Sequence, residues 1–300
     1  MKDNNILILN KIKSKYIIKI IFQFIKKHKK LNVINYNKKL QKDLDIKLKD
    51  YIDYYQLNAE IIIMIQKNIK PIDKLIDINK NLYNLYIDDK LFSIDSNNNN
   101  INKLKSSKLK FVIKNGCNSL MNLFQNLIYI QNISFIRFVI INITDMSSMF
   151  SGCSNLSKLN LSYFKTNNVI NMKNMFYECS SLIEIDLSNF KTNNVNNMGY
   201  MFYKCKALTK LNLSNFNVEN VKYVNSMFEE CTSLKIINLS NFQAKKLINM
   251  NRMFYNCTSL EVIITNNFYV PKIRNNKNIF KGCNCLKNLE ELKKIFILNE

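Results

Sequence analysis

Six cysteines return at a constant interval, and this interval constrains the fold more than any other feature of the sequence. Each stands 26 positions after the last: Cys153, Cys179, Cys205, Cys231, Cys257 and Cys283. A phenylalanine stands three positions before each cysteine and a leucine three positions after it. Such fixed apolar columns indicate that every unit presents the same inward face and covers its neighbour's, which predicts a repeat array with one continuous core.

The spacing within each unit predicts a strand. The period of 26 lies within the range of leucine-rich repeats, and Leu156-x-x-Leu159-x-Leu161 matches their strand signature. Since strand side chains alternate between faces, we expect Leu159 and Leu161 inside and Lys158 and Asn160 outside. Strands of successive units would form a parallel ladder. A degenerate copy with Leu127 in the cysteine position places the start of the array near residue 120.

One stretch of the array also carries a resemblance to a known family. Residues 175–190 read Met-Phe-Tyr-Glu-Cys-Ser-Ser-Leu-Ile-Glu-Ile-Asp-Leu-Ser-Asn-Phe. This stretch resembles the BspA-type leucine-rich repeats, which are known from surface proteins of bacteria, mycoplasmas and anaerobic protists. The resemblance implies a solenoid that binds other proteins, host or matrix proteins in several members, and implies no catalysis.

The predicted fold class is an α/β repeat: a leucine-rich-repeat solenoid with a parallel strand ladder, preceded by a small helical module and closed by a C-terminal capping helix. We expect the helical module in residues 1–70 and a connecting segment with an Asn-rich loop in residues 71–119. The solenoid would occupy residues 120–285 and the capping helix residues 286–300. In that helix Leu289 and Leu292 would cover the open end of the core.

The N-terminal segment predicts short helices. Apolar residues recur at helical spacing in residues 11–30, with lysines mainly on the other side. Helices ahead of leucine-rich repeats are similar in layout to F-box adaptors, and this layout implies a docking partner for the N-terminal helices, a ubiquitin-ligase subunit. No secretion signal is recognised, because Lys19 and Gln23 interrupt the one apolar stretch. A cytoplasmic location is expected, with the cell surface as the alternative.

Charge gives little specific information about partners. The chain has 44 basic and 22 acidic residues, a net charge of +22 at pH 7, which favours anionic partners in general. No window reaches the length of a membrane span. The face that the strands would expose is not an unbroken basic stripe, so we expect no specific nucleic-acid recognition.

Residue types that carry chemistry are scarce. His28 is the only histidine, which removes His-based triads and His metal clusters. The four glycines form no phosphate-binding loop, and Cys283 with Cys285 is a lone C-x-C that lacks a second pair of zinc ligands. Glu184 and Asp186 could form a carboxylate dyad, but an exposed strand face gives little desolvation, so a recognition role is favoured. We therefore expect no enzyme, no cofactor and no metal.

The remaining function is recognition by the strand face. Its outward residues change from charged in the early repeats to apolar in the late ones, which suits a protein or peptide ligand. The candidate binding residues are Lys158, Asn160, Glu184, Asp186, Lys210, Asn212, Ile236, Asn238, Val262 and Ile264. The prediction is a non-catalytic protein-interaction module, with a BspA-type cell-surface adhesin or an F-box-like adaptor as alternatives.

Overall fold

The computed structural model describes a large part of the chain from residue 59 onward. The described residues are 59–65, 83–87, 90–92, 108–113, 117–137, 142–162, 164–273 and 275–296. The chain divides into two compact units between residues 57 and 58, and every described residue belongs to the second unit. The helices predicted within residues 1–57, together with His28, lie outside the described residues.

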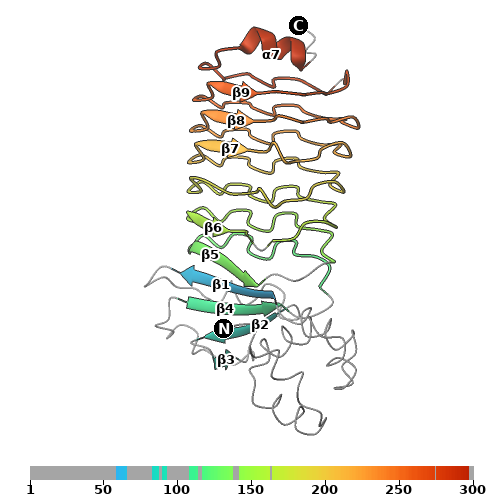
Figure 1. The fold of residues 1–300 in the computed structure, drawn as a ribbon. Coiled ribbons are helices and arrows are strands. Elements are labelled where there is room, and N and C mark those ends of the chain that lie inside the picture. The colour runs from blue at the N-terminus through green and yellow to red at the C-terminus, as the bar shows by residue number, and fades with distance from the viewer. Residues whose placement is uncertain are drawn as a thin grey trace, which may run out of the picture. The chain divides into compact units, whose positions relative to one another are not determined.

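Parallel strands line one side of a stack of repeat units, which we call rungs (Figure 1). Strand β5 (Ile130–Arg137) pairs with β6 (Lys158–Asn160), and a second sheet contains β7 (Lys210–Asn212), β8 (Ile236–Asn238) and β9 (Val262–Ile264). Each pair is in register at the offset of the sequence repeat, as in Ile237↔Ile263. The array is thus a repeat fold with parallel strands, as the sequence period predicted, and it contains little helix.

Consecutive tight turns, rather than helices, form the side of each rung that contains the Met-Phe pair. Their backbone N–H groups donate to carbonyls of the next rung, as Phe176 does to Met201 at 2.9 Å. Two positions per rung adopt a left-handed backbone, for example Asn174 (φ 58°) and Glu178 (φ 56°). A non-glycine residue in this conformation costs about 1–2 kcal/mol. The hydrogen bonds that these two N–H groups make to the next rung, to Gly199 and Tyr203, offset that cost.

A second line of parallel contacts runs along the turn side. Single bridges join equivalent positions of successive rungs, in the order Asp145, Asn171, Asn197, Tyr223 and Asn249. Most side chains in this column cap the turn that follows them; the Asn197 Oδ1 atom, for example, accepts the backbone N–H of the residue two positions on at 3.0 Å. These local bonds explain why asparagine is frequent at the bends.

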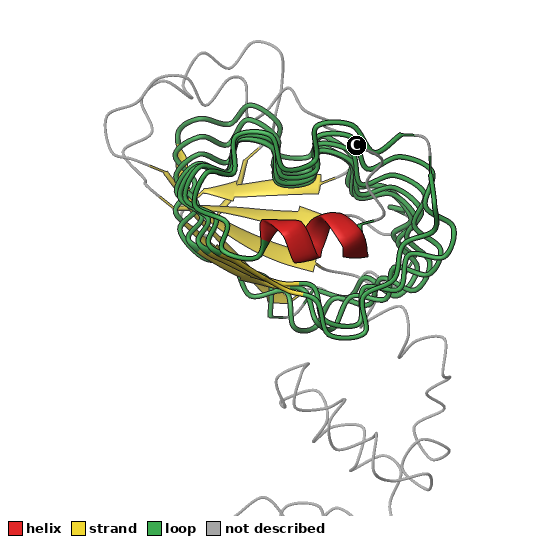
Figure 2. Cartoon of the chain, turned by 90° about the horizontal axis from the view of Figure 1, so that it is seen from above, coloured by secondary structure: helices red, strands yellow, loops and turns green. Residues whose placement is uncertain are grey.

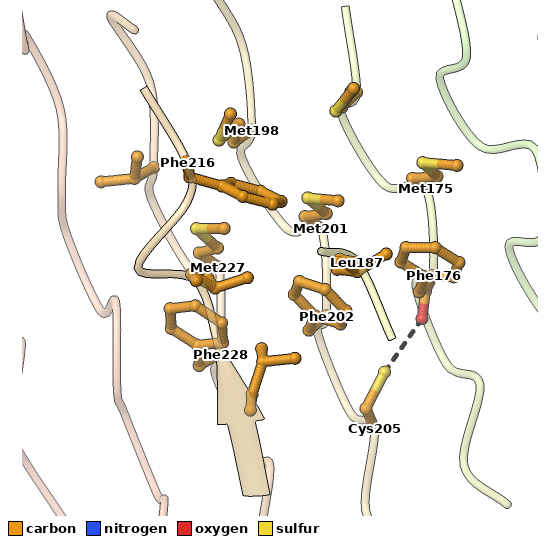
Figure 3. Packing of buried hydrophobic residues seen from close by; sticks show 14 of the residues in the cluster. Met175, Phe176, Leu187, Met198, Met201, Phe202, Cys205, Phe216, Met227 and Phe228 are labelled. Atoms are coloured by element: carbon orange, nitrogen blue, oxygen red, sulfur yellow. Dashed lines mark hydrogen bonds between the residues drawn. The ribbon is translucent and has the colours of Figure 1, made fainter. Parts of the chain in front are cut away.

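Stacked phenylalanines fill the interior. The column that contains Phe176, Phe202 and Phe228 has ring centroids 5.2–5.8 Å apart, and the rings are nearly parallel. Figure 3 shows the methionine column beside it, including Met201 and Met227, all fully buried. Offset aromatic stacking adds about 0.5–1.5 kcal/mol per pair beyond area burial. Because its side chains are fully buried, the methionine column is also part of the core.

Four antiparallel strands continue the sheet at its N-terminal end. They are β1 (Ala59–Ile65), β2 (Tyr83–Ile87), β3 (Lys90–Phe92) and β4 (Lys108–Ile113), and the sheet order is β3-β2-β4-β1-β5-β6. β1 pairs antiparallel with β5. The helical prediction is therefore wrong for residues 59–65, and the segment predicted as a connector contains three strands. A run of β-branched isoleucines favours a strand, and the otherwise open edge of β5 supplies a pairing partner.

Helix α7 (Leu289–Ile295) closes the C-terminal end, as predicted for a capping element. Viewed from above, the rungs superimpose and α7 lies across the interior that they surround (Figure 2). Leu292 and Phe296 are fully buried. The Phe296 ring meets Phe280 edge-on, with centroids 5.1 Å apart, so it ends the phenylalanine column.

One buried charge interrupts a column of tyrosines. Tyr177 and Tyr203 stack with centroids 4.6 Å apart, and Glu229 takes the same position in the next rung with 3% of its surface exposed. Arg252 forms a bidentate pair with this carboxylate, with Nε 2.9 Å from Oε2. Its guanidinium lies 3.8 Å from the centre of the Tyr255 ring. A lysine could provide neither the two parallel bonds nor the flat stacking.

The burial of two positions in one rung can be tested with a pair of variants. Leu208 is fully buried, whereas Lys210 is exposed. We expect Leu208→Ala to lower stability by about 2–5 kcal/mol, because it leaves a cavity in the core. Lys210→Ala should leave the urea midpoint nearly unchanged, and equal shifts for the two variants would contradict the assigned faces.

The Glu229–Arg252 pair gives a second prediction. Arg252→Gln leaves a buried carboxylate without its cation, and we expect a loss of about 1–3 kcal/mol, below the value for a fully buried pair. The expected loss is smaller than for a fully buried pair because solvent screens this one, since the Arg252 side chain is 42% exposed. In urea denaturation the stability of Arg252→Lys should lie between that of Arg252→Gln and that of the unmodified chain, because lysine keeps the charge but not the two parallel bonds. Lys245→Gln breaks the exposed pair with Glu219 and serves as a control that should change little; a shift as large as that of Arg252→Gln would refute the prediction.

Candidate functional site

The structure places all ten predicted binding residues on one face of the array, which we call the strand face. Eight of them lie on β6, β7, β8 and β9, and the other two lie on the rung between β6 and β7. Seven are exposed, and Asn238, Val262 and Ile264 are partly buried. Between the outward positions, Leu211 and Ile237 point inward and are buried. The predicted alternation is therefore present in these strands.

A groove of about 1000 Å³ runs along the strand face. It contains eight of the ten predicted residues, all except Val262 and Ile264. It also includes residues that the sequence analysis did not select, among them Asn132, Ser134 and Ile183. Ile183 is 54% exposed. It lies one residue before the outward pair of its rung, a position that strand alternation assigns to the inside.

The second outward position of each rung has a structural task. Asn160, Asp186, Asn212 and Asn238 each accept, through Oδ1, the backbone N–H of the serine two positions later, at 2.9–3.0 Å. The backbone N–H and the hydroxyl of Ser188 lower the pKa of Asp186. This carboxyl is therefore held ionised, which does not suit a general acid. Four of the ten predicted binding residues thus stabilise the turn that follows the outward pair of their rung.

The residues at the first outward position of successive rungs form a column whose middle members alternate in charge. Its residues in order are Asn132, Lys158, Glu184, Lys210, Ile236 and Val262. The backbone ladder is interrupted in the middle of this column, because one sheet ends at β6 and the next begins at β7. Glu184 lies on the rung between them. The turn side remains bonded at the same level, where Met172 donates to Asn197 at 2.9 Å.

One polar atom at the N-terminal end of the groove is left without a hydrogen bond. The Oδ1 atom of Asn132 is buried and has no partner in the described part of the chain. Buried polar atoms are nearly always bonded, so an unpaired one is unusual. Asn132 is the parallel-strand partner of Lys158, so this atom lies next to the first charged residue of the column.

The cysteine column is structural. Each thiol from Cys153 to Cys283 donates to the carbonyl of the phenylalanine in the preceding rung at 2.9–3.2 Å, as Cys205 does to Phe176 in Figure 3. Burial raises the pKa of the thiols from Cys153 to Cys257, to about 12 in Cys153. A protonated, hydrogen-bonded thiol is neither a nucleophile nor a metal ligand.

The other candidate chemistry is not assembled in the residues that the structure describes. Cys283 is buried and Cys285 is exposed, so the C-x-C motif does not present two thiols to one ligand. Within the same described ranges, no group of three or more His, Cys, Asp or Glu side chains could hold a metal ion.

Thiol accessibility provides a direct test. We expect iodoacetamide to modify Cys285 first in the native protein, because it is the exposed thiol. The thiols from Cys153 to Cys257 should remain unmodified until urea unfolds the array, since they are buried and protonated at mildly alkaline pH. Peptide mapping by mass spectrometry gives the order of modification. Native-state labelling of Cys205 as fast as that of Cys285 would show that the column is open.

Comparisons with known proteins identify a family. No helix among the described residues has the length and apolarity to cross a membrane. Neither the curated proteins nor the solved structures gave a match. Two overlapping segments, residues 118–234 and 209–292, match the model of a family described as "Mycoplasma protein of unknown function, DUF285". Together they span more than half of the 300 residues and coincide with the stack of rungs. The chain therefore belongs to the DUF285 family.

Proposed function

We propose that residues 120–285 form a leucine-rich-repeat solenoid of the BspA type that binds a protein or peptide on its strand face. The observation that carries this proposal is the groove, which contains Lys158, Glu184, Lys210 and Ile236 in one line. The rungs are bonded to one another through the backbone on the turn side. They would therefore present the groove as a largely preformed surface, which lowers the entropic cost of binding.

The mixed character of the groove supports a protein or peptide ligand over a polyanion. Lysines alternate with a glutamate, and the apolar residue Ile236 follows. A nucleic acid would place phosphates against Glu184 and Asp186, which is unfavourable. Protein interfaces instead combine an apolar part with paired charges.

The same geometry supports a non-catalytic role. The groove is open to solvent, so it gives little desolvation to raise the pKa of an acid. Asp186 is bonded to the following turn and has a lowered pKa. The buried thiols of the cysteine column are on the inside and do not face the groove. These observations support recognition of a ligand by the groove rather than catalysis.

Two isoleucines allow a matched test of the proposed surface. Ile236 lines the groove and is 46% exposed, while Ile248 lies outside the groove lining and is 45% exposed. We expect peptides selected against the full chain from a random display library to bind Ile236→Arg at least about tenfold more weakly, because the new side chain blocks the groove and places a charge where the ligand would have an apolar group.

Ile248→Arg is the control, since it adds the same charge at the same exposure. Binding to it should equal that of the unmodified chain in fluorescence anisotropy. Selected peptides that bind Ile236→Arg without loss, or that lose affinity equally for both variants, would refute the strand face as the binding surface, as would a library that yields no binder.

A further inference from the structure

Three neighbouring charges in the groove have no ion-pair partner among the described residues, whereas three glutamates elsewhere on the array pair with a lysine of the adjacent rung. Outside the groove, glutamate and lysine residues at equivalent positions of adjacent rungs form ion pairs: Glu219 with Lys245 and Glu261 with Lys287, both at 2.8 Å. Glu178 and Lys204 also pair, at 3.5 Å. Glu184 has a lysine on each side at the same separation, yet it pairs with neither in the part of the chain that the structure describes.

The interrupted ladder coincides with these unpaired charges. Glu184 lies on the rung between β6 and β7, which belongs to neither sheet and keeps one backbone bond on this side to the next rung, from the Thr209 N–H to the Ile183 carbonyl at 3.3 Å. The neighbouring lysines, Lys158 and Lys210, each begin the strand that borders this gap. All three side chains line the groove and are exposed. Water solvates them in the free protein, so they remain available to a ligand.

A ligand that fills the groove removes this water. Charges that lose their hydration without gaining a partner oppose binding strongly, and like charges placed opposite one another oppose it further. An occupant must therefore offer an acidic group to Lys158, a basic group to Glu184 and a second acidic group to Lys210. Beyond them, Ile236 requires an apolar group.

We infer that the groove binds an extended peptide segment with acidic, basic, acidic and apolar side chains in that order, running from Lys158 toward Ile236. This inference rests on the proposed function and specifies its ligand. Adjacent rungs lie about 4.8 Å apart and an extended peptide advances about 3.3 Å per residue. Because the side chains of an extended peptide alternate between faces, the residues that face the groove would occupy every second position, about 6.6 Å apart, and the long lysine side chains span the remaining difference.

Fixed asparagines next to this column add main-chain recognition. The Oδ1 atoms of Asn160 and Asn212 are bound to their turns at 3.0 Å. Their Nδ2 groups have no hydrogen-bond partner among the described residues, so each remains a donor in the groove. Donors held in place by a second bond suit the carbonyl groups of an extended peptide, which repeat along the chain whatever its sequence. The chain's net charge of +22 also favours an occupant with net negative charge.

A charge-reversal experiment tests the inference. Two labelled synthetic peptides are compared by fluorescence anisotropy at low salt: one with acidic, basic and acidic side chains at the stated spacing followed by leucine, and one with these charges reversed. The full chain should prefer the first by at least about tenfold. The triple variant Lys158→Glu, Glu184→Lys, Lys210→Glu should reverse that preference, and high salt should reduce both affinities.

Controls separate this inference from the proposed function. The single variant Glu184→Lys, which places three lysines in a row, should lose affinity for the first peptide even if the triple variant folds poorly. Lys222→Glu, an exposed change outside the groove lining, should leave the preference intact. If neither peptide is preferred while library-selected peptides still fail on Ile236→Arg, the charge pattern is wrong and the binding surface stands. If no peptide binds the groove at all, both proposals fail.

Discussion

The backbone hydrogen bonds between rungs determine everything else in this array. On the turn side the N–H group of Phe176 reaches the carbonyl of Met201, and on the strand side Ile237 lies in register with Ile263. A single insertion in any rung would displace every partner in that rung, so the interval is strictly kept. Identical offsets bring identical side chains together, and the phenylalanines therefore stack at 5.2–5.8 Å along the interior. The cysteines recur for the same reason, because a thiol at this position donates to the carbonyl of the phenylalanine in the preceding rung.

Periodic features could be predicted from the sequence, and this includes most of the core. Leu208 and Phe202 are buried because each stands in a column of like residues, and the outward positions Lys210 and Asn212 follow from strand alternation. The C-terminal cap could also be expected, since the last rung leaves apolar surface that α7 covers. The sequence pattern therefore predicts which face of the array is exposed.

Features that occur once were not predictable in the same way. The antiparallel strand β1 depends on the free edge of β5, which is a property of the folded end of the sheet and not of residues 59–65 themselves. Pairing of Glu229 with Arg252 joins side chains whose separation in sequence differs from the repeat interval. The turn-capping role of Asn160 could have been recognised, because an Asn or Asp two positions before a serine recurs in successive rungs and such side chains cap turns. The interrupted ladder at Glu184 has no counterpart in the sequence pattern.

Family membership determines the buried columns that recur in every rung, but it does not determine the exposed residues that differ from rung to rung. The family match covers residues 118–292, which are the rungs, and the rungs are specified by buried columns that vary little. Residues at the first outward position contribute almost nothing to the core, so each can change without loss of the fold. In this chain the first outward column has Lys158, Glu184 and Lys210 followed by Ile236, a sequence of side chains that the scaffold does not require. Membership in a family therefore fixes the scaffold, and under the proposed function a few exposed side chains at fixed spacing along the groove would select the ligand.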